Sequence, residues 1–531
     1  MHEHTPPPGP EAAQRELPAA HSPRLLAAVV GAAAAAIASA LMLWAARSWA
    51  GIHLAQLISE RLTAIVPLAV FEDVLLRLES SAKPATLSGL IVLQVLVGAL
   101  AALLYSRFAP RSWPRALNAL LLFAISWALL SLLVAPLSGI GLLGHDASVG
   151  LTRAQATLAL TAAAYTLIVA AFVPPPAVSA SAPNASRRHL MKTAGLAALA
   201  VPTVVSAGYM ARFVRSLQRT PATRETGFSA SPFSFPNMPP AITPNRDFYV
   251  VSKNFIDPSV DETSWTLEIG GLVDTPITFT YEQMLARPSV EFISTLECIS
   301  NPVGGPYIST ARWRGFSLRD LLLEAGIQPG TVDIAFHAAD DYVDSIPLSE
   351  GLAEDTMLVH TMNDEPLPVL HGFPLRAIVP GIFGMKNVKW ITRIEAVGED
   401  ILGYWQQREW NDNAPVLTMS RVDAPREGQR VPLGTRRQIG GVAFAGDRGI
   451  SKVEVSLDDG VSWQECELSE PLSSLTWRLW KVPYEATEAG MVNVTVRATD
   501  GTGALQTSEE RDILPSGATG WHRRTFEVTA S

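Results

Sequence analysis

Five long apolar stretches in the first 211 residues constrain what this chain can fold into. Each is long enough to cross the hydrocarbon core of a bilayer, which needs about 20 apolar residues in a helix. A single stretch of this kind could be a buried helix in a soluble core, but five in succession favour membrane spans. The sequence therefore predicts an α-helical membrane domain over 25–211 in a lipid bilayer, with spans at 25–46, 85–105, 116–136, 156–173 and 193–211.

The segments around the first span have a different character. Residues 1–24 are rich in Pro and Ala without apolar periodicity, which is typical of a disordered tail. Between the first two spans, the acidic and basic residues of Ile52–Glu79 leave only Leu62–Phe71 apolar. That stretch is too short to cross, so we expect one or two amphipathic helices lying on the membrane interface.

Arginines in the short loops predict the orientation. The loop after the second span holds Arg107, Arg111 and Arg115, and the loop after the fourth holds Arg187 and Arg188, whereas the loop after the third has only Arg153. Arginine-rich loops stay on the cytoplasmic side. We therefore expect a multi-pass protein of the cytoplasmic membrane, with its N-terminal tail in the cytoplasm and everything after the fifth span outside.

The pair Arg187-Arg188 precedes a moderately apolar stretch and also resembles a twin-arginine export signal. An ordinary positively charged flank is the alternative. Export of a folded domain is the hypothesis that we carry forward.

After a proline-containing linker, 212–242, the pattern becomes globular. Short strands and helices intermix, which predicts an α+β domain over 243–405. Ser317–Ala325 is an expected helix with Leu318, Leu321, Leu322 and Ala325 on one face. From 415 to 530, short alternating strands with turn signals such as Asp458-Asp459-Gly460 predict a β-sandwich. The net charge of −9 without a basic block argues against nucleic acid as a partner.

Cys298 is one of only two cysteines. Val290–Ile293 is typical of a short strand, and a Gly/Pro-rich run, Pro302–Gly305, follows the cysteine. Such a position can aim a sulfur atom into a pocket, although a buried small side chain is the alternative. The other cysteine, Cys466, lies in an expected strand of the sandwich, where we expect a core thiol.

The surroundings of Cys298 resemble a known family. Thr295-Leu-Glu-Cys298-Ile-Ser-Asn301 resembles the segment that carries the molybdenum-binding thiolate in the sulfite oxidase family, and Tyr342-Val-Asp-Ser345-Ile-Pro347 resembles its active-site tyrosine motif. Four more stretches follow in the family's order: Glu365–Pro368, His371–Arg376, Val379–Gly381 and Lys386–Trp390. The resemblance implies a molybdopterin domain followed by an immunoglobulin-like dimerisation domain, and hence a possible homodimer.

The resemblance also implies roles for individual residues. Cys298 would supply a soft thiolate to molybdenum beside the dithiolene sulfurs of the pterin cofactor. Tyr342 would donate a hydrogen bond at the open metal position and pass a proton. His371, Arg376 and Lys389 would hold the cofactor phosphate, and Asp340 would hold the edge of the pterin ring. The remaining cofactor contacts implied by the motifs are Tyr249, Ser252, Lys253, Asn387 and Val388.

The sequence departs from the family at the substrate site. Sulfite oxidases carry arginines after the asparagine of the cysteine segment, whereas Pro302–Gly305 stand here, so Arg312 and Arg314 are the candidates for charge near the substrate. Asn387 also stands where the family's best-known enzymes have His. A small oxyanion and a bulkier sulfoxide-type compound therefore both stay open as substrates.

No Cys-x-x-Cys-His haem attachment site is present, and the apolar spans contain no histidine pair. We expect no haem in this chain and a separate electron carrier, either a cytochrome or a quinone-linked protein. Three functions remain open: oxygen-atom transfer that oxidises sulfite or a relative, reduction of S-oxides or N-oxides at the same site, and a non-catalytic membrane-anchored scaffold.

Overall fold

The computed structural model describes residues 23–48, 52–65, 82–110, 112–147, 150–173, 200, 202–208, 232–254, 257–258 and 260–530. The chain divides into two compact units, 1–61 with 83–217 and 62–82 with 218–531, and each is considered by itself. Several predictions fall outside the described residues. These are most of the disordered tail predicted over 1–24, the second half of the predicted interfacial segment, most of the fifth span and the Arg187-Arg188 pair. The last two residues of that tail, Pro23 and Arg24, are instead the first two residues of a helix, so the tail prediction is wrong there.

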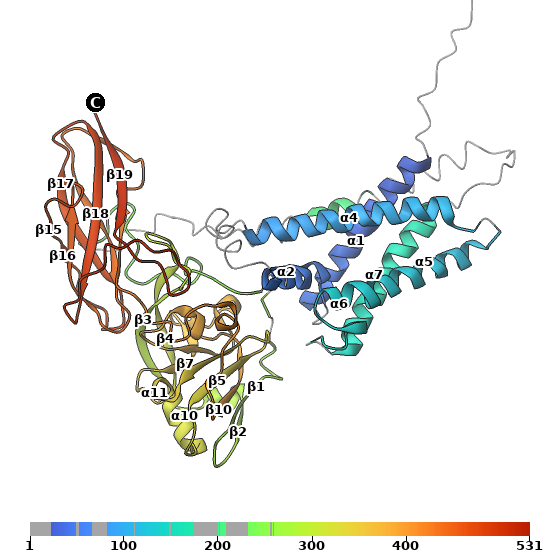
Figure 1. Cartoon of the computed structure of the whole chain (residues 1–531), viewed down its shortest axis with the longest axis horizontal. Coiled ribbons are helices and arrows are strands. Elements are labelled where there is room, and N and C mark those ends of the chain that lie inside the picture. Colours follow the sequence, from blue (N-terminus) through green and yellow to red (C-terminus); the bar gives the residue numbers. More distant parts are fainter. Residues whose placement is uncertain are drawn as a thin grey trace, which may run out of the picture. The chain divides into compact units, whose positions relative to one another are not determined.

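The first unit is helical (Figure 1). Its main helices are α1 (Pro23–Ser48), α2 (Leu54–Ile65), α4 (Ala82–Phe108), α5 (Arg115–Leu129) and α7 (Leu151–Phe172). A π-helical turn over Leu130–Val134 continues α5 into α6 (Ala135–Leu137). Within the described residues, four helical stretches are long and apolar enough to cross a membrane by length and composition: Arg24–Ala46, Ala85–Phe108, Arg115–Leu137 and Leu151–Phe172.

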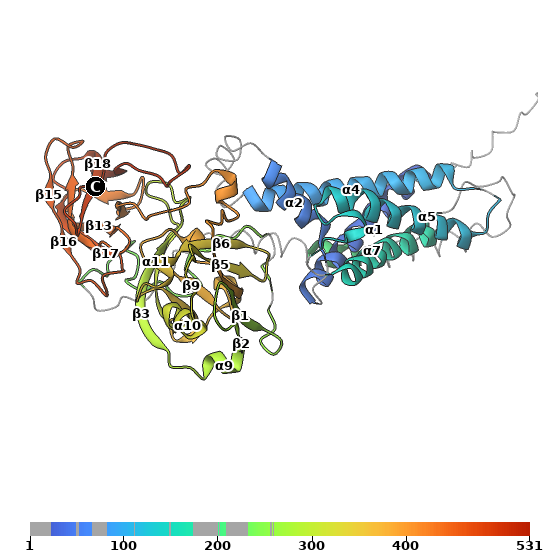
Figure 2. The ribbon, with the colours of Figure 1, turned by 60° about the horizontal axis from the view of Figure 1, so that its bottom comes forward.

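These four stretches coincide with the first four predicted spans, while the crossing itself stays a prediction. Helix α2 has 12 residues, which is too few to span a bilayer. Figure 2 shows α1, α4, α5 and α7 gathered in one bundle, in which α7 packs against both α1 and α5.

Small residues let two of these helices approach closely. A Cβ atom at Gly31 of α1 would lie 2.5 Å from the carbonyl oxygen of Gly98 in α4, so only glycine fits there. The hydroxyl of Tyr165, on α7, donates a hydrogen bond of 2.6 Å to the same Gly98 carbonyl. Three helices therefore meet at one point.

The second unit begins with two sheets and short helices. One sheet has the order β2-β1-β10-β5-β6. Helix α10 (Leu318–Ala325) buries Leu318, Leu321, Leu322 and Ala325 in the same hydrophobic core as this sheet, as its periodicity predicts. Helices α9 (Tyr281–Leu285) and α11 (Leu348–Gly351) are shorter. The strands of this sheet are β1 (Thr266–Gly271), β2 (Ile277–Thr280), β5 (Asp333–Ala338), β6 (Val343–Pro347) and β10 (Ile391–Val397).

The second sheet carries the cysteine segment. It consists of β3 (Val290–Glu297), β4 (Ile308–Ser317), β7 (Met357–Met362) and β8 (Glu365–Pro366), with β9 (Arg376–Ile378) paired to β7. Strand β3 is four residues longer than the sequence predicts, because every residue through Glu297 pairs with β4. Cys298 is therefore the first residue after a fully paired strand, and its N–H donates to the carbonyl of Tyr307 over 3.0 Å.

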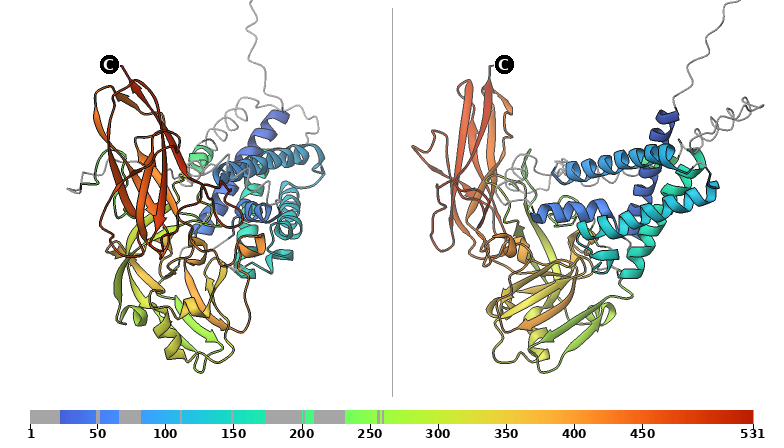
Figure 3. Two further views of the ribbon diagram at one scale, coloured as in Figure 1. Left: turned by 60° about the vertical axis from the view of Figure 1, so that its left-hand side comes forward. Right: turned by 45° about the vertical axis from the view of Figure 1, so that its right-hand side comes forward.

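A two-sheet β-sandwich follows, as predicted (Figure 3). One sheet has the order β11-β13-β17-β16 and the other β12-β19-β18-β14-β15. Side chains of both sheets, among them Trp480 and Phe526, share one core that also contains Cys466. The strands are β11 (Met419–Ala424), β12 (Arg430–Pro432), β13 (Arg436–Phe444), β14 (Ile450–Ser456), β15 (Gln464–Glu465), β16 (Glu467–Leu468), β17 (Arg478–Glu485), β18 (Gly490–Asp500) and β19 (His522–Thr529).

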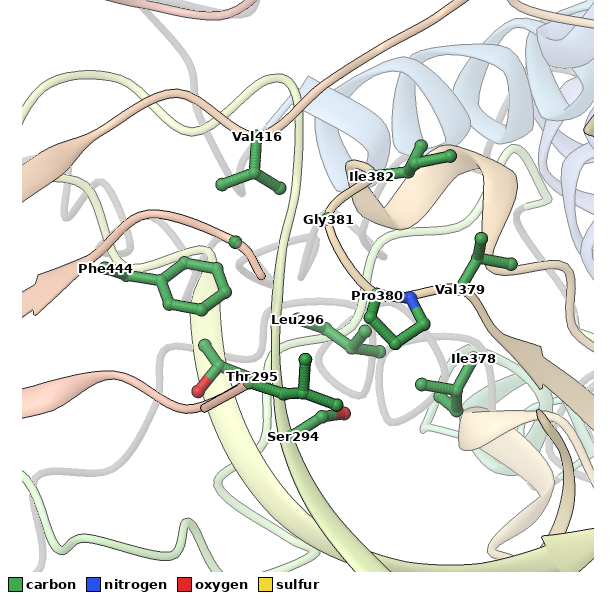
Figure 4. A pocket seen from close by; sticks show the side chains of 12 residues that line it. Ser294, Thr295, Leu296, Ile378, Val379, Pro380, Gly381, Ile382, Val416 and Phe444 are labelled. Atoms are coloured by element: carbon green, nitrogen blue, oxygen red, sulfur yellow. The ribbon is translucent and has the colours of Figure 1, made fainter. Parts of the chain in front are cut away.

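The sandwich is hydrogen-bonded to the cysteine strand. The N–H of Thr295 donates to the carbonyl of Leu475 over 3.0 Å, and the Thr295 hydroxyl accepts from the N–H of Trp477 over 2.9 Å. Figure 4 shows an apolar crevice at this junction, lined by side chains such as Leu296, Ile378 and Phe444. None of the predicted site residues lines this crevice, so the candidate site lies elsewhere along the strand.

Candidate active site

A tight loop holds Cys298 at the end of β3. The N–H of Asn301 donates to the Cys298 carbonyl over 2.9 Å. The Asn301 side chain donates to Glu297 Oε1 and accepts from the N–H of Tyr307, each over 2.9 Å. The Cys298 side chain is buried, and its Sγ lies 3.1 Å from the Ser300 hydroxyl oxygen. The sulfur is thus fixed by backbone and side-chain bonds on both sides of the loop.

Two phenols and a lysine lie near this sulfur. Burial raises the pKa of Tyr249 and of Tyr342 well above the usual value, and the nearby Cys298 adds to both shifts. Burial also raises the pKa of the Cys298 thiol, which the Ser300 hydrogen bonds and the charge of Lys389 oppose. The structure therefore brings three of the predicted residues, Tyr249, Tyr342 and Lys389, near the Cys298 thiol.

Gly384 shows how close the surrounding loop comes to this group. A Cβ atom there would lie 2.6 Å from the Tyr249 hydroxyl oxygen and 3.2 Å from the carbonyl oxygen of Glu297. The chain must therefore have glycine at this position for the loop to close over the phenol.

Arg376 is a buried cation that donates hydrogen bonds to carbonyl groups. Its guanidinium donates to the carbonyls of His371 and Asn387 over 3.1 and 3.2 Å, and it lies over the Trp313 ring. Its Nε has no partner, and no carboxylate forms an ion pair with it in the part of the chain that is described. Burial lowers its pKa to about 10. A buried cation without a counter-charge is costly, so this position fits an anionic group of a ligand.

The other two predicted phosphate contacts lie beside Arg376. Gly372 has φ +114°, and a Cβ atom there would lie 3.0 Å from the Cβ of Lys389 and 3.1 Å from the Cβ of Arg376. His371 is adjacent in the chain, and its Nε2 bonds to the carbonyl of Asn245 over 2.8 Å. Glycine at 372 thus allows the three basic residues to gather.

Asp340 and the segment 252–254 form a second group. The Lys253 ammonium donates to the Asp340 carbonyl over 2.6 Å, and the Asn254 amide donates to the Asp340 carboxylate over the same distance. The Ser252 hydroxyl accepts from the N–H of Asn254 over 3.1 Å, and Asp340 also accepts from the N–H of Tyr342 over 3.2 Å. The segment predicted to wrap the cofactor is therefore tied to the tyrosine motif.

Asn387 and Val388 shape the loop around the site through internal bonds. The Asn387 side chain accepts from the N–H of Val379 over 2.8 Å and donates to the carbonyls of Ile382 and Phe383. Val388 is buried, and its carbonyl accepts from the N–H of Ala377 over 2.8 Å. Direct contact of either side chain with a cofactor stays a prediction.

Arg312 and Arg314 are not brought to Cys298. Arg314 pairs with Glu291 over 3.0 Å, and Arg312 lies 3.5 Å from the same carboxylate. Cys298 bonds to Tyr307, which lies five residues before Arg312 along an extended chain, or roughly 16 Å at ~3.3 Å per residue. Both arginines are ion-paired at the other end of the β3–β4 pair, which the sequence could not show.

The sequence reasoning also missed residues that surround the site. The Tyr342 hydroxyl lies 2.7 Å from Asp344 Oδ2 and 2.9 Å from the carbonyl oxygen of Met385. From the sandwich, Arg421 donates to the carbonyl of Gly305 over 2.7 Å, and the imidazole of His522 packs on Gly304. Asp344 stands inside the tyrosine motif. A charged residue within the short strand β6 was the sequence feature that could have identified it.

The residues present fit a molybdenum cofactor with a terminal phosphate. Cys298 offers one soft thiolate, and the unpartnered Nε of Arg376 offers a buried donor to an anion. No group of three or more His, Cys, Asp or Glu side chains converges to hold a metal within the described ranges. A metal at Cys298 would take its other ligands from the cofactor.

Comparison with known families and proteins adds independent findings. The oxidoreductase molybdopterin binding domain matches residues 254–405, and the Mo-co oxidoreductase dimerisation domain matches residues 414–528. Sulfite oxidase of Gallus gallus is 30% identical over 336 residues, which cover 53% of this chain and 72% of that protein. Mitochondrial sulfite oxidase of Homo sapiens is 30% identical over 308 residues, which cover 49% of this chain and 56% of that protein.

The chain thus spans less than two thirds of the human protein's length. Among solved structures, the sulfane dehydrogenase SoxCD of Paracoccus pantotrophus matches with a TM-score of 0.48 at 22% identity, covering 55% of this chain and 84% of that chain.

Proposed function

Because the chain belongs to the sulfite oxidase family of molybdopterin oxidoreductases, we propose that it transfers oxygen atoms at a sulfur centre and oxidises sulfite or a related compound. The observation that carries this proposal is the gathering of Tyr249, Tyr342 and Lys389 around the buried Cys298 thiol.

The proposal assigns each residue a task. Cys298 holds the metal, while Arg376, His371 and Lys389 hold the phosphate through charge and hydrogen bonds. When bound, the cofactor supplies exchange of an oxygen atom and an electron pair with the substrate. Tyr342 moves a proton in the pocket, and Tyr249 helps to keep water out because it is buried against the loop at Gly384.

A second candidate is reduction of an S-oxide or N-oxide at the same site. It is supported by how little positive charge the described residues of the cysteine loop offer to an anionic substrate. Val303 stands in the loop with 39% of its surface exposed, and Arg312 and Arg314 are both occupied by Glu291. Arg421 reaches this loop from the sandwich, but it is held by the Gly305 carbonyl and by Asp423. The described residues of the loop itself carry no cation, so a dianion such as sulfite is stabilised less here than at a site lined by arginines.

The two directions can be separated by paired assays on the purified full-length protein. Sulfite oxidation would be measured with an artificial electron acceptor, and sulfoxide reduction with an artificial donor, in the native protein and in Cys298→Ser. The proposal expects turnover in one direction and its loss in the variant. Full turnover in Cys298→Ser would exclude Cys298 as the metal ligand.

The setting of the enzyme is part of the same proposal. We place the catalytic unit on the extracytoplasmic side of the cytoplasmic membrane, anchored by the four long apolar helices and by the fifth predicted span, 193–211. Electrons would pass to a separate cytochrome or quinone-linked carrier, and the sandwich would join two copies of the chain, as the matched dimerisation domain suggests. Replacing Arg187 and Arg188 with lysine should leave the catalytic unit inside, protected from external protease, and unchanged export would reject the twin-arginine route.

A further inference from the structure

A buried ionic cluster contacts the Tyr342 hydroxyl through Asp344. Asp344, on β6, has 0% of its side chain exposed, and its Oδ1 lies 3.2 Å from the ammonium of Lys386, whose side chain is 2% exposed. Lys386 also donates to the Ser345 carbonyl over 2.7 Å and to Asp412 over 2.8 Å. The Gln406 amide donates to both Asp344 oxygens, over 3.1 and 3.3 Å. Burial of such a cluster is costly, which makes a purely structural role a weak explanation.

The cluster determines where the hydrogen of the Tyr342 hydroxyl points. A phenol has one hydrogen to donate, and the two acceptors within reach are Asp344 Oδ2 at 2.7 Å and the Met385 carbonyl at 2.9 Å. A carboxylate is the stronger acceptor, because hydrogen bonds to a charged group are shorter and roughly twice as strong. The Tyr342 O–H bond therefore points at Asp344 Oδ2, and the phenol oxygen has its lone pairs in the other directions.

This geometry revises the expectation that Tyr342 donates into the pocket. We propose that Asp344 is a positioning residue that holds the hydrogen of the Tyr342 hydroxyl, so that Tyr342 accepts a proton released by the reaction at Cys298 while passing its own to Asp344. The inference rests on the proposed function, since it needs a reaction at Cys298 that releases a proton. It deepens that function by assigning the second member of the proton-moving pair.

The proton step balances within the residues named. The O–H bond of Tyr342 breaks as its proton moves to Asp344 Oδ2, and a new O–H bond forms between the phenol oxygen and the proton released in the pocket. No electron moves in this step, and the carboxylate becomes a carboxylic acid until it returns the proton. Burial raises the pKa of Asp344, which Lys386 and the Tyr342 hydrogen bond oppose, so this carboxylate is a better proton acceptor than an exposed one.

A double-mutant cycle in the full-length holoenzyme tests the coupling. The variants are Tyr342→Phe, Asp344→Asn and the two combined, with kcat compared at equal molybdenum content. If Asp344 acts through Tyr342, each single change should lower kcat by about 10²–10⁴-fold, and the combined variant should be no slower than Tyr342→Phe. Independent losses that multiply in the combined variant would overturn the proposal.

A second measurement detects the interaction between Tyr342 and Asp344 without catalytic turnover. Replacing tyrosine by 3,5-difluorotyrosine throughout the full chain brings the phenols into a range where fluorine NMR can titrate them, and the residue 342 signal is the one missing in Tyr342→Phe. Removing the Asp344 charge should lower the pKa of residue 342 by about one unit or more, since the carboxylate opposes the phenolate. An unchanged pKa in Asp344→Asn would overturn the proposal even if activity were lost.

Controls separate this proposal from misfolding and from failure of the proposed function. If Asp344→Asn does not fold, Asp344→Asn with Lys386→Gln removes both charges and should give the same two results. Asp412→Asn makes the same chemical change on the outer side of Lys386, where 33% of the carboxylate side chain is exposed, and should leave kcat within about threefold. Full turnover in Tyr342→Phe would reject the proton path while leaving Cys298 as the metal ligand untouched.

Discussion

Gly304 lies in the loop after Cys298, and replacing it with alanine tests whether the β-sandwich fixes that loop. Its φ is +75°, and a Cβ atom there would overlap the His522 ring, whose Cγ would be only 3.0 Å away. His522 cannot easily retreat, because its Nδ1 accepts from the N–H of Val422 over 3.0 Å. The alanine variant must therefore displace either the ring or the loop.

The expected cost has two parts. A non-glycine residue in the left-handed region costs about 1–2 kcal/mol, and overpacking against a fixed side chain adds about 1–3 kcal/mol. The sum, about 2–5 kcal/mol, corresponds to a rise of roughly 30-fold to several thousandfold in local opening, at tenfold per ~1.4 kcal/mol. Gly428 is the matched control, since its φ is +65° and nothing lies within 4 Å of a Cβ atom there.

Hydrogen exchange read by mass spectrometry measures this effect in the folded protein. The reporting amides are those of Cys298, Asn301 and Gly305, which are all hydrogen-bonded within the loop or to its end. Gly304→Ala should speed their exchange, whereas Gly428→Ala should leave them at the native rate and affect only its own surroundings. Adding His522→Ala should restore part of the protection by making room. Native exchange rates in Gly304→Ala would refute the idea that His522 presses on the loop.

Two further predictions concern charged groups. Arg376→Met should lower molybdenum retention by about 10–100-fold, measured as metal per protein, whereas Arg319→Met, which removes an exposed ion pair with Glu354, should not. Burial and the cations Arg524 and Arg421 lower the pKa of His522 from 6.5 to about 3, so between these values the unfolded state binds the extra proton. The free energy of unfolding should therefore fall by up to ~1.4 kcal/mol for each pH unit as the pH drops through this window. If the His522→Gln variant shows the same slope of unfolding free energy against pH, His522 is not the group responsible.

Periodicity predicted the elements whose own residues decide their structure. The buried face of α10 follows from leucines spaced three and four apart, and its Ser317 cap and left-handed Gly326 bound the helix. The strands of the sandwich follow from alternation between turn signals. The extension of β3 through Glu297 was missed because its polar residues Ser294 and Thr295 do not mark a core strand. The strand continues there because its backbone pairs with β4 and because Thr295 bonds to Leu475 and Trp477 of the sandwich.

The site could be predicted as far as the family motifs extend. Tyr342 and Lys389 do lie near the Cys298 thiol, and Lys389 lies beside Arg376 at Gly372, while the roles assigned to these residues stay predictions. The sequence could not predict contacts between residues that are far apart in the chain, such as the ion pair between Glu291 on β3 and Arg314 on β4. The bond from Asp344 to Lys386, 42 residues later, is of the same kind. Such contacts depend on strand register and loop closure, which no local pattern encodes.

X-ray absorption at the molybdenum edge of the purified full-length protein tests the central claim most directly. The account predicts a metal with one more sulfur neighbour than the cofactor alone provides, and the loss of that one sulfur in Cys298→Ser. A native sulfur count that is unchanged in the variant, or protein that retains no molybdenum at all when produced with cofactor available, would contradict it.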